Sequence, residues 1–271
     1  MTFSTHLVVD IETIPDPDLP LPEPRKDAPV ARLCDPPPPP FPAPPHHKIV
    51  CVGYAWLTGY RVASSVPWGS LAHPRDSEAD ILRQLVKALA DEDPVFVGFN
   101  SRSFDLPVIA SRCLVHGIPF PWYYDAPTVR RSARYRYSEA RHLDLCDVLS
   151  DHGAAPRAQL DTWARAVGFP GKKVAAKGRK EGLTGADVAT LYAAGRHGEN
   201  EDYCVRDVAQ TVAVLLRAQL LRGVLPLEGD YGYLDCASRL LDAIAESDRT
   251  RPLVAGIDRN RFLLHHEPTE I

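Results

Sequence analysis

The sequence predicts an α/β fold built around a mixed central sheet. Residues 5–10 form a short apolar run that is typical of a buried strand. Two further strand patterns are joined by the turn Thr58-Gly59, and the next strand follows only after an amphipathic helix. Strands joined by a tight turn run antiparallel, whereas strands joined through a helix can run parallel. We therefore expect strands one to three to be antiparallel and the next one to be parallel.

The strand patterns after residues 5–10 occupy residues 47–57, 60–68 and 94–100. Apolar side chains recur at helical spacing over residues 76–92, and Ser77 stands at the start as a candidate N-cap. The order strand, hairpin, helix, strand is typical of an α/β sheet with helices on its faces.

Helices dominate the second half of the chain. The apolar spacing predicts them over residues 103–117, 159–169, 184–195, 200–223 and 234–246. The fourth of these is the longest, and it ends at a glycine, the residue preferred just beyond a helix C-terminus.

Length and composition limit the class of protein. The 271 residues are 45% apolar, which is enough for one sizeable core. We expect a domain over residues 1–225 and a helical extension over residues 226–271 that packs on it or trails from it. The six cysteines are scattered without a CxxC pair, which argues against structural zinc and a disulfide framework. The formal net charge of −4 excludes a uniformly basic nucleic-acid binder, but it allows a local basic face.

No targeting or membrane signal is visible in the sequence. The N-terminus lacks a basic segment followed by an apolar stretch, and no apolar stretch reaches membrane-spanning length. We expect a cytoplasmic enzyme or binding protein with no membrane partner.

A proline-rich insert spans residues 15–47. Residues 15–45 hold 14 of the 26 prolines, five of them consecutive at 36–40. Proline cannot donate to a sheet ladder and is excluded from helix interiors, so this segment is predicted to be a surface excursion outside the core.

Two acids stand one residue apart at the end of the first strand pattern. Asp10 and Glu12 share one face of the strand because alternate side chains point the same way. Like charges held together are unfavourable unless a cation offsets them, and carboxylates suit magnesium or manganese. A lone D-x-E at a strand end is nevertheless common, so the hypothesis of a metal site needs further partners.

Three later residues are candidate partners of this pair. Asp105 falls near the start of the helix that follows the strand at 94–100, where the helix dipole also favours an acid. Tyr203 and Asp207 are four residues apart, so they project from one face of the longest helix. Asp207 lies at the edge of the apolar stripe, where an unpaired acid is unfavourable.

Taken in order, these motifs resemble a known family. The D-x-E on strand one, the acid opening a helix and the late Y-x-x-x-D are similar to the DnaQ-like 3′→5′ exonucleases of ribonuclease-H-like fold, in the DEDDy subgroup, whose last motif carries tyrosine. More narrowly, the chain resembles predicted exonucleases related to the proofreading domain of family B DNA polymerases. The segments HLDLCDVLSDHGAAPRAQLDTWARAVGFPGK and YAAGRHGENEDYCVRDVAQTVAVLLRAQLLRG extend the similarity beyond the motifs, over roughly residues 5–223.

The resemblance implies hydrolysis of a terminal phosphodiester by a two-metal mechanism. It implies that two divalent ions, Mg²⁺ or Mn²⁺, bind at four acids, and that a tyrosine orients the attacking water. The catalytic residues so implied are Asp10, Glu12, Asp105, Tyr203 and Asp207, and the four acids among them are the metal ligands.

The expected partner is single-stranded DNA or a DNA 3′ end. The resemblance places Thr13 and Ile14 beside the terminal nucleotide, and Asn100 and Phe104 near the bases. Two basic stretches are candidates to follow the phosphate backbone, although most charge runs are simply solvated. The residues singled out there are Arg130, Arg131 and Arg134 in residues 130–141, and Lys172 and Lys173 in residues 171–180.

Two alternative functions stay open at this point. The first is an exoribonuclease or a structure-specific nuclease on the same fold, since the carboxylates do not distinguish these substrates. The second is a non-catalytic nucleic-acid-binding protein. Retention of all four acids and the tyrosine argues against the second alternative. The sequence identifies no protein partner.

Overall fold

The computed structural model describes residues 4–19, 41–64, 66–173 and 185–264. The strands are β1 (Thr5–Pro15), β2 (His47–Thr58), β3 (Arg61–Val62), β4 (Gly69–Ala72), β5 (Val95–Gly98) and β6 (His142–Asp144). The helices are α1 (Glu78–Glu92), α2 (Asp105–Val115), α3 (Pro121–Tyr124), α4 (Leu145–Leu149), α5 (Leu160–Ala166), α6 (Gly185–Ala193), α7 (His197–Leu221), α8 (Tyr233–Glu246) and α9 (Arg259–Phe262).

The strands form one mixed sheet with β1 at its centre. The order is β3-β2-β1-β5-β6, and β4 also pairs with β2. The pairs of β2 with β1, β3 and β4 are antiparallel, whereas β5 is parallel to β1 and to β6. This arrangement confirms the predicted α/β class and the change from antiparallel to parallel pairing.

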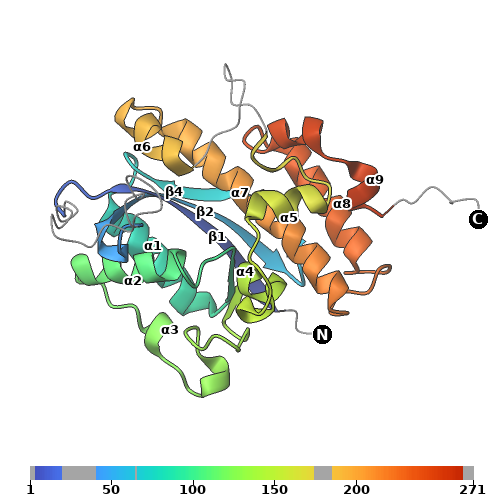
Figure 1. Cartoon of the computed structure of the whole chain (residues 1–271), viewed down its shortest axis with the longest axis horizontal. Helices are drawn as coiled ribbons and strands as arrows, with labels where there is room; N and C mark the ends of the chain where they lie inside the picture. The colour runs from blue at the N-terminus through green and yellow to red at the C-terminus, as the bar shows by residue number, and fades with distance from the viewer. Residues whose placement is uncertain (1–3, 20–40, 65, 174–184, 265–271) are drawn as a thin grey trace, which may run out of the picture.

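The alternation of side chains along β1 decides which layer each of them meets. Leu7, Val9 and Ile11 pack in one core together with α1 and α2. Val8 packs in a second core together with α7 and α8. Figure 1 shows the sheet between these two helical layers. Because Asp10 shares the parity of Val8, its side chain lies on the α7 side of the sheet.

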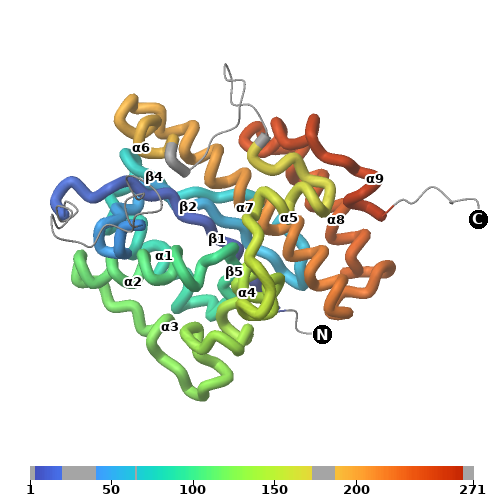
Figure 2. The backbone as a smooth tube through the Cα atoms, in the orientation of Figure 1, coloured from blue at the N-terminus to red at the C-terminus, as the bar shows by residue number. Residues whose placement is uncertain are grey.

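A glycine lets α7 approach the centre of the sheet. Gly53 of β2 pairs with Asp10 of β1, and its backbone N–H donates to the Sγ atom of Cys204 in α7 at 3.1 Å. A Cβ atom added at Gly53 would lie 2.9 Å from that sulfur and 3.1 Å from the Cys204 carbonyl carbon. Figure 2 shows β1 and α7 side by side although they are far apart in the sequence. The lack of a side chain at Gly53 therefore lets α7 pack against the sheet beside Asp10.

Several element boundaries differ from the prediction, and three of the differences have a clear physical reason. The first strand continues to Pro15, five residues beyond its predicted end, because β2 pairs with it along its whole length, with a register shift between Glu12 and Thr13. Residues 60–68 do not form one strand: β3 is two residues long, and β4 makes a second pairing with β2. Helix α2 begins at Asp105, because the backbone N–H groups of residues 103 and 104 donate to the Asn100 carbonyl in a turn.

The ends of the proline-rich insert are anchored by a buried ion network. Arg112 of α2 donates from Nε and Nη2 to the two carboxylate oxygens of Glu78, at 2.7 and 2.6 Å. Its Nη1 donates to Asp16 on one side of the insert and to the Pro45 carbonyl on the other. Arg112 is 3% exposed, and both carboxylates are equally shielded. The insert residues 20–40 lie outside the described residues.

The residues after α7 pack back onto it. Tyr233 of α8 and Phe262 of α9 are fully buried and belong to the same core as the apolar face of α7. No helix in the described part of the chain is both long and apolar enough to cross a membrane.

Candidate active site

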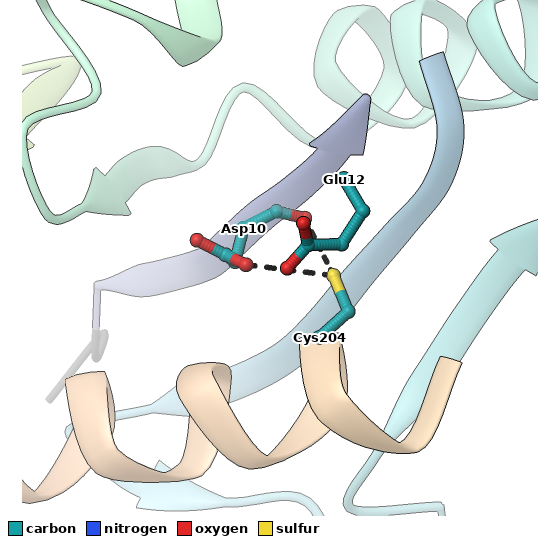
Figure 3. Close-up of side chains that lie close together, drawn as sticks. All are labelled: Asp10, Glu12 and Cys204. Atoms are coloured by element: carbon teal, nitrogen blue, oxygen red, sulfur yellow. Dashed lines mark hydrogen bonds between the residues drawn. The ribbon is translucent and has the colours of Figure 1, made fainter. Parts of the chain in front are cut away.

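The first two acids project from β1 toward α7. Figure 3 shows the carboxylates of Asp10 and Glu12 beside the thiol of Cys204. One carboxylate oxygen of each acid and the Cys204 Sγ atom all lie within 4.8 Å of one another. The thiol lies 3.3 Å from the Asp10 carbonyl oxygen and 3.5 Å from its Oδ2. Glu12 is buried and Asp10 is half-buried, so Asp10 is the more accessible of the pair.

The third acid, Asp105, opens helix α2 and is 4% exposed. Its carboxylate accepts hydrogen bonds from its own backbone N–H and from that of Ile11, which ties it to the strand between the first two acids. The turn before it is held by Asp144 of β6, whose carboxylate accepts the N–H groups of Asn100 and Arg102, both at 2.9 Å. Asp144 is therefore a structural support for the turn that precedes the third acid.

The last motif comes from the middle of α7. Tyr203 and Asp207 are 7% and 6% exposed, and their side chains are hydrogen-bonded to each other. Gln210, one turn further along, donates from Nε2 to Asp207 Oδ1 at 3.2 Å. The predicted spacing of four residues thus places both side chains on the face of α7 that looks onto β1.

A cavity of about 430 Å³ opens beside these residues. Asp10 and Asp207 line it on one side, and Asn100, Asp161 and Lys172 line it elsewhere. Of the five predicted catalytic residues, Asp10 and Asp207 line this cavity. Glu12, Asp105 and Tyr203 do not line it, but they lie close enough to this pair for their charges to interact.

Burial and mutual repulsion define the electrostatics of this cluster. Burial raises the pKa of Asp10 and of Glu12 well above the ordinary carboxyl value, and the neighbouring carboxylate of Asp207 raises both further. Burial likewise raises the pKa of Asp207, while Lys172 opposes the rise. It raises the pKa of Asp105 to about 7. A cluster of this kind is unfavourable when fully ionised, and bound cations relieve that cost.

The raised pKa of Asp105 predicts how the metal-free protein responds to pH. Between about pH 4 and pH 7 the folded protein holds a proton that the unfolded chain has released, so the free energy of unfolding falls as the pH rises through this window. Asp105→Asn removes this pH-dependent contribution to the free energy of unfolding. In EDTA at pH 8 the variant should be more stable than the wild type by about 2–4 kcal/mol.

Urea denaturation in EDTA between pH 5 and pH 8 measures this effect. Asp242→Asn, at an exposed position on α8, is the matched control and should leave the pH dependence unchanged. A parallel decline of the wild type and Asp105→Asn with rising pH would contradict the assignment.

Lys172 lies inside the acidic cluster, where the sequence alone did not place it. Its Nζ atom donates to the Tyr203 hydroxyl at 2.7 Å and lies 3.8 Å from Asp207 Oδ2. Its backbone N–H donates to Asp161 Oδ1 at 2.6 Å, which fixes the segment beside α5. In the sequence Lys172 is recognisable only as part of a basic run, and the side chains of such runs usually extend into solvent. The side chain of Lys173 lies outside the described residues.

The other residues predicted to contact nucleic acid divide into two groups. Thr13 follows Glu12 directly, and Ile14 packs against the small buried cluster that includes Tyr203. Asn100 lines the cavity, and Phe104 precedes Asp105. These four are near the acids in the chain or line the cavity, and their contact with nucleic acid stays a prediction. The predicted arginines do not line the cavity. The structure places Arg130 on the surface, Arg131 at 3.1 Å from an oxygen of Asp93, and Arg134 over the ring of Tyr124.

Comparison with known proteins identifies the family. Residues 39–255 match the family described as a predicted 3′-5′ exonuclease related to the exonuclease domain of PolB. The chain belongs to this exonuclease family. The matched range includes Asp105, Tyr203 and Asp207, whereas Asp10 and Glu12 precede it. The chain is thus assigned to a family of predicted nucleases.

Solved structures agree with this assignment at the level of the fold. The family B DNA polymerase of the hyperthermophilic archaeon Pyrobaculum calidifontis is similar over 96% of this chain and 28% of the polymerase, with 17% identity and a TM-score of 0.50. E. coli exonuclease I in complex with a 5cy-dT13 oligonucleotide is similar over 81% of this chain and 41% of the exonuclease, with 14% identity and a TM-score of 0.37. The second likeness is too distant to support an inference. This exonuclease-family chain spans less than half of either protein, and no curated protein matches it in sequence.

The donor set fits a divalent ion of hard character. Asp10, Glu12, Asp105 and Asp207 offer carboxylate oxygens, the ligands preferred by Mg²⁺ and Mn²⁺. The thiol of Cys204 is held by hydrogen bonds with Gly53 N–H and Asp10 O, and burial raises its pKa well above the ordinary value. A protonated thiol is a poor metal ligand, so the oxygen set is the one suited to binding.

Proposed function

We propose that the protein is a metal-dependent 3′–5′ exonuclease that hydrolyses terminal phosphodiesters of single-stranded DNA. The supporting observation is that Asp10 of β1 and Asp207 of α7 line one cavity. Glu12, Asp105 and Tyr203 lie close enough to these two acids for their charges to interact. Burying mutually repelling acids is unfavourable for folding, so their gathering is better explained by a bound ligand than by stability. Membership of the exonuclease family supports the same reaction class.

The proposed roles follow from the positions of the side chains. Asp10, Glu12, Asp105 and Asp207 would hold two divalent ions, Mg²⁺ or Mn²⁺. When bound, such ions polarise the phosphoryl oxygens and lower the pKa of water. Burial and the neighbouring carboxylates hold the pKa of Tyr203 well above its ordinary value, so its hydroxyl stays protonated and acts as a hydrogen-bonding group rather than a base.

Lys172 provides a prediction that separates a role in the site from a contact with the DNA backbone. Its ammonium is the cation that opposes the raised pKa of Asp207, and it donates to Tyr203. We expect Lys172→Met to lower kcat by about 10–100-fold through misplaced site residues, with little change in the salt dependence of KM.

Steady-state kinetics at several salt concentrations test this prediction. A lysine that contacts only a phosphate would reduce the salt slope by about one when replaced and would leave kcat nearly unchanged. Arg130→Ala, at an exposed position in the other basic stretch, is a comparison for that behaviour. A smaller salt slope with a nearly unchanged kcat in Lys172→Met would contradict the assignment of Lys172 to the active site.

Side-by-side digestion of 5′-labelled single strands of DNA and RNA, and of duplex DNA, tests the substrate. We expect shortening of the DNA strand from its 3′ end, dependent on Mg²⁺ or Mn²⁺. Faster digestion of RNA would favour an exoribonuclease, and action confined to duplex or branched ends would favour a structure-specific nuclease. Binding without digestion of any strand would favour a non-catalytic nucleic-acid-binding protein.

A further inference from the structure

The end of the proline-rich insert returns to β1 directly beside the acids. Asp16, just after β1, donates its backbone N–H to the His46 carbonyl at 2.8 Å. The Nδ1 atom of the next residue, His47, is 3.1 Å from the Thr13 hydroxyl, one residue beyond Glu12. The insert is thereby held against the strand at the edge of the candidate site.

Three rings cluster at this point. Phe41 of the insert stacks on His47 with ring centroids 5.3 Å apart, and it meets the edge of Phe104 at 5.8 Å. His47 and Phe104 are in edge contact at 5.1 Å. Two residues at this cluster are chain neighbours of the acids, because Thr13, which contacts His47, follows Glu12, and Phe104 precedes Asp105.

The rings differ sharply in exposure. His47 is 8% exposed, whereas Phe41 is 76% exposed. Phe41 therefore covers the imidazole with one face and leaves most of its own surface to solvent. A single exposed apolar residue needs no explanation. This one, however, is oriented by two ring contacts, and its partner His47 contacts Thr13, the residue after Glu12.

The state of His47 makes the surface apolar rather than cationic. Its Nε2 atom lies 3.2 Å from the Pro42 carbonyl, which can only accept, so Nε2 carries a proton. In the neutral ring Nδ1 then accepts from the Thr13 hydroxyl. Burial also lowers the pKa of this imidazole, in keeping with a neutral ring. A neutral pair of stacked rings suits the face of a nucleobase better than a phosphate.

We propose that Phe41, backed by His47, is a stacking surface for an unpaired nucleobase near the 3′ end of the substrate strand. This inference rests on the proposed exonuclease function. A contact by Phe104 is implied by the family resemblance, whereas Phe41 and His47 belong to the proline-rich insert and add a contact of this chain's own. His47 is a positioning residue, which fixes the Phe41 ring and the Thr13 hydroxyl. Every base offers a π face, so the surface accepts all four bases.

Kinetics on strands with missing bases test the stacking directly. The substrates are 5′-labelled single strands that are intact or carry one abasic nucleotide at each of the last three positions in turn. Phe41→Ala should lower kcat/KM on the intact strand by about tenfold, mainly through KM. On the strand that lacks the stacked base this loss should disappear, while Phe41→Tyr should behave like the wild type on every strand.

Controls separate stacking from general damage and from failure of the proposed function. Leu114→Ala truncates an apolar side chain that is 84% exposed on α2, and it should change nothing. An equal loss in Phe41→Ala on intact and abasic strands, or no loss at all, would overturn the stacking surface while leaving the nuclease intact. A wild type that digests no single strand would overturn the proposed function and this inference together.

Discussion

Replacing Asp207 by asparagine is expected to abolish metal-dependent digestion, lowering kcat by about a thousandfold or more. The side chain is 6% exposed, lines the cavity and faces the same space as Asp10. Asparagine keeps the shape of the side chain but removes the negative charge that a divalent ion requires. Because burial already raises the pKa of Asp207, losing the charge should not destabilise the metal-free fold.

The measurement is single-strand digestion in saturating Mn²⁺, combined with thermal denaturation of the same samples. Glu201→Gln, on the same helix and paired with Arg75 and Arg249, changes a charge outside the cavity and should retain activity. Digestion by a folded Asp207→Asn at the wild-type rate would show that the acids have been assigned wrongly.

Replacing Arg112 by alanine should produce the largest loss of stability, about 3–5 kcal/mol. Arg112 neutralises Glu78 and Asp16 in a site where all three side chains are almost completely shielded. Without the guanidinium, two carboxylates stay buried without their main cation. The loss should also release both ends of the proline-rich insert, since Arg112 binds Asp16 on one side and the Pro45 carbonyl on the other.

Urea denaturation at pH 7 measures this loss. The matched control is Arg83→Ala, because Arg83 and its partner Asp80 on α1 are 60% and 54% exposed, and an ion pair of that kind contributes less than about 1 kcal/mol. A similar small loss for Arg112→Ala would mean that the network does not anchor the insert.

Local patterns in the sequence were sufficient to locate the longer helices. Helix α1 begins where the spacing predicted, and Ser77 accepts the Asp80 N–H as its N-cap. Helix α8 spans Tyr233–Glu246 against a predicted 234–246. These features depend on neighbours three or four residues apart, which a single sequence displays.

Features that depend on distant partners were predicted less well. The length of β1 is set by pairing with β2, which lies beyond the insert. Within residues 60–68 only the two-residue β3 pairs with β2, and the next pairing with β2 is made by β4. No local pattern specifies such long-range hydrogen bonds.

The candidate site shows the same division. Parity along β1 was enough to place Asp10 and Glu12 together, and helical spacing was enough for Tyr203 and Asp207. Tertiary packing, in contrast, decides that Lys172 reaches Tyr203 and that His47 reaches Thr13, across 31 and 34 residues of chain. Neither contact produces a periodic pattern in the sequence.

The central claim is that Asp10, Glu12, Asp105 and Asp207 form one divalent-cation site, and binding of Mn²⁺ tests it most directly. Electron paramagnetic resonance of free Mn²⁺ during titration counts the bound ions for the wild type and for Asp10→Asn. We expect saturable binding by the wild type and its loss in a folded Asp10→Asn, because Asp10 lines the cavity and lies closest to Glu12 among the other acids. Equal Mn²⁺ binding by both proteins, or none by the wild type, would contradict the account.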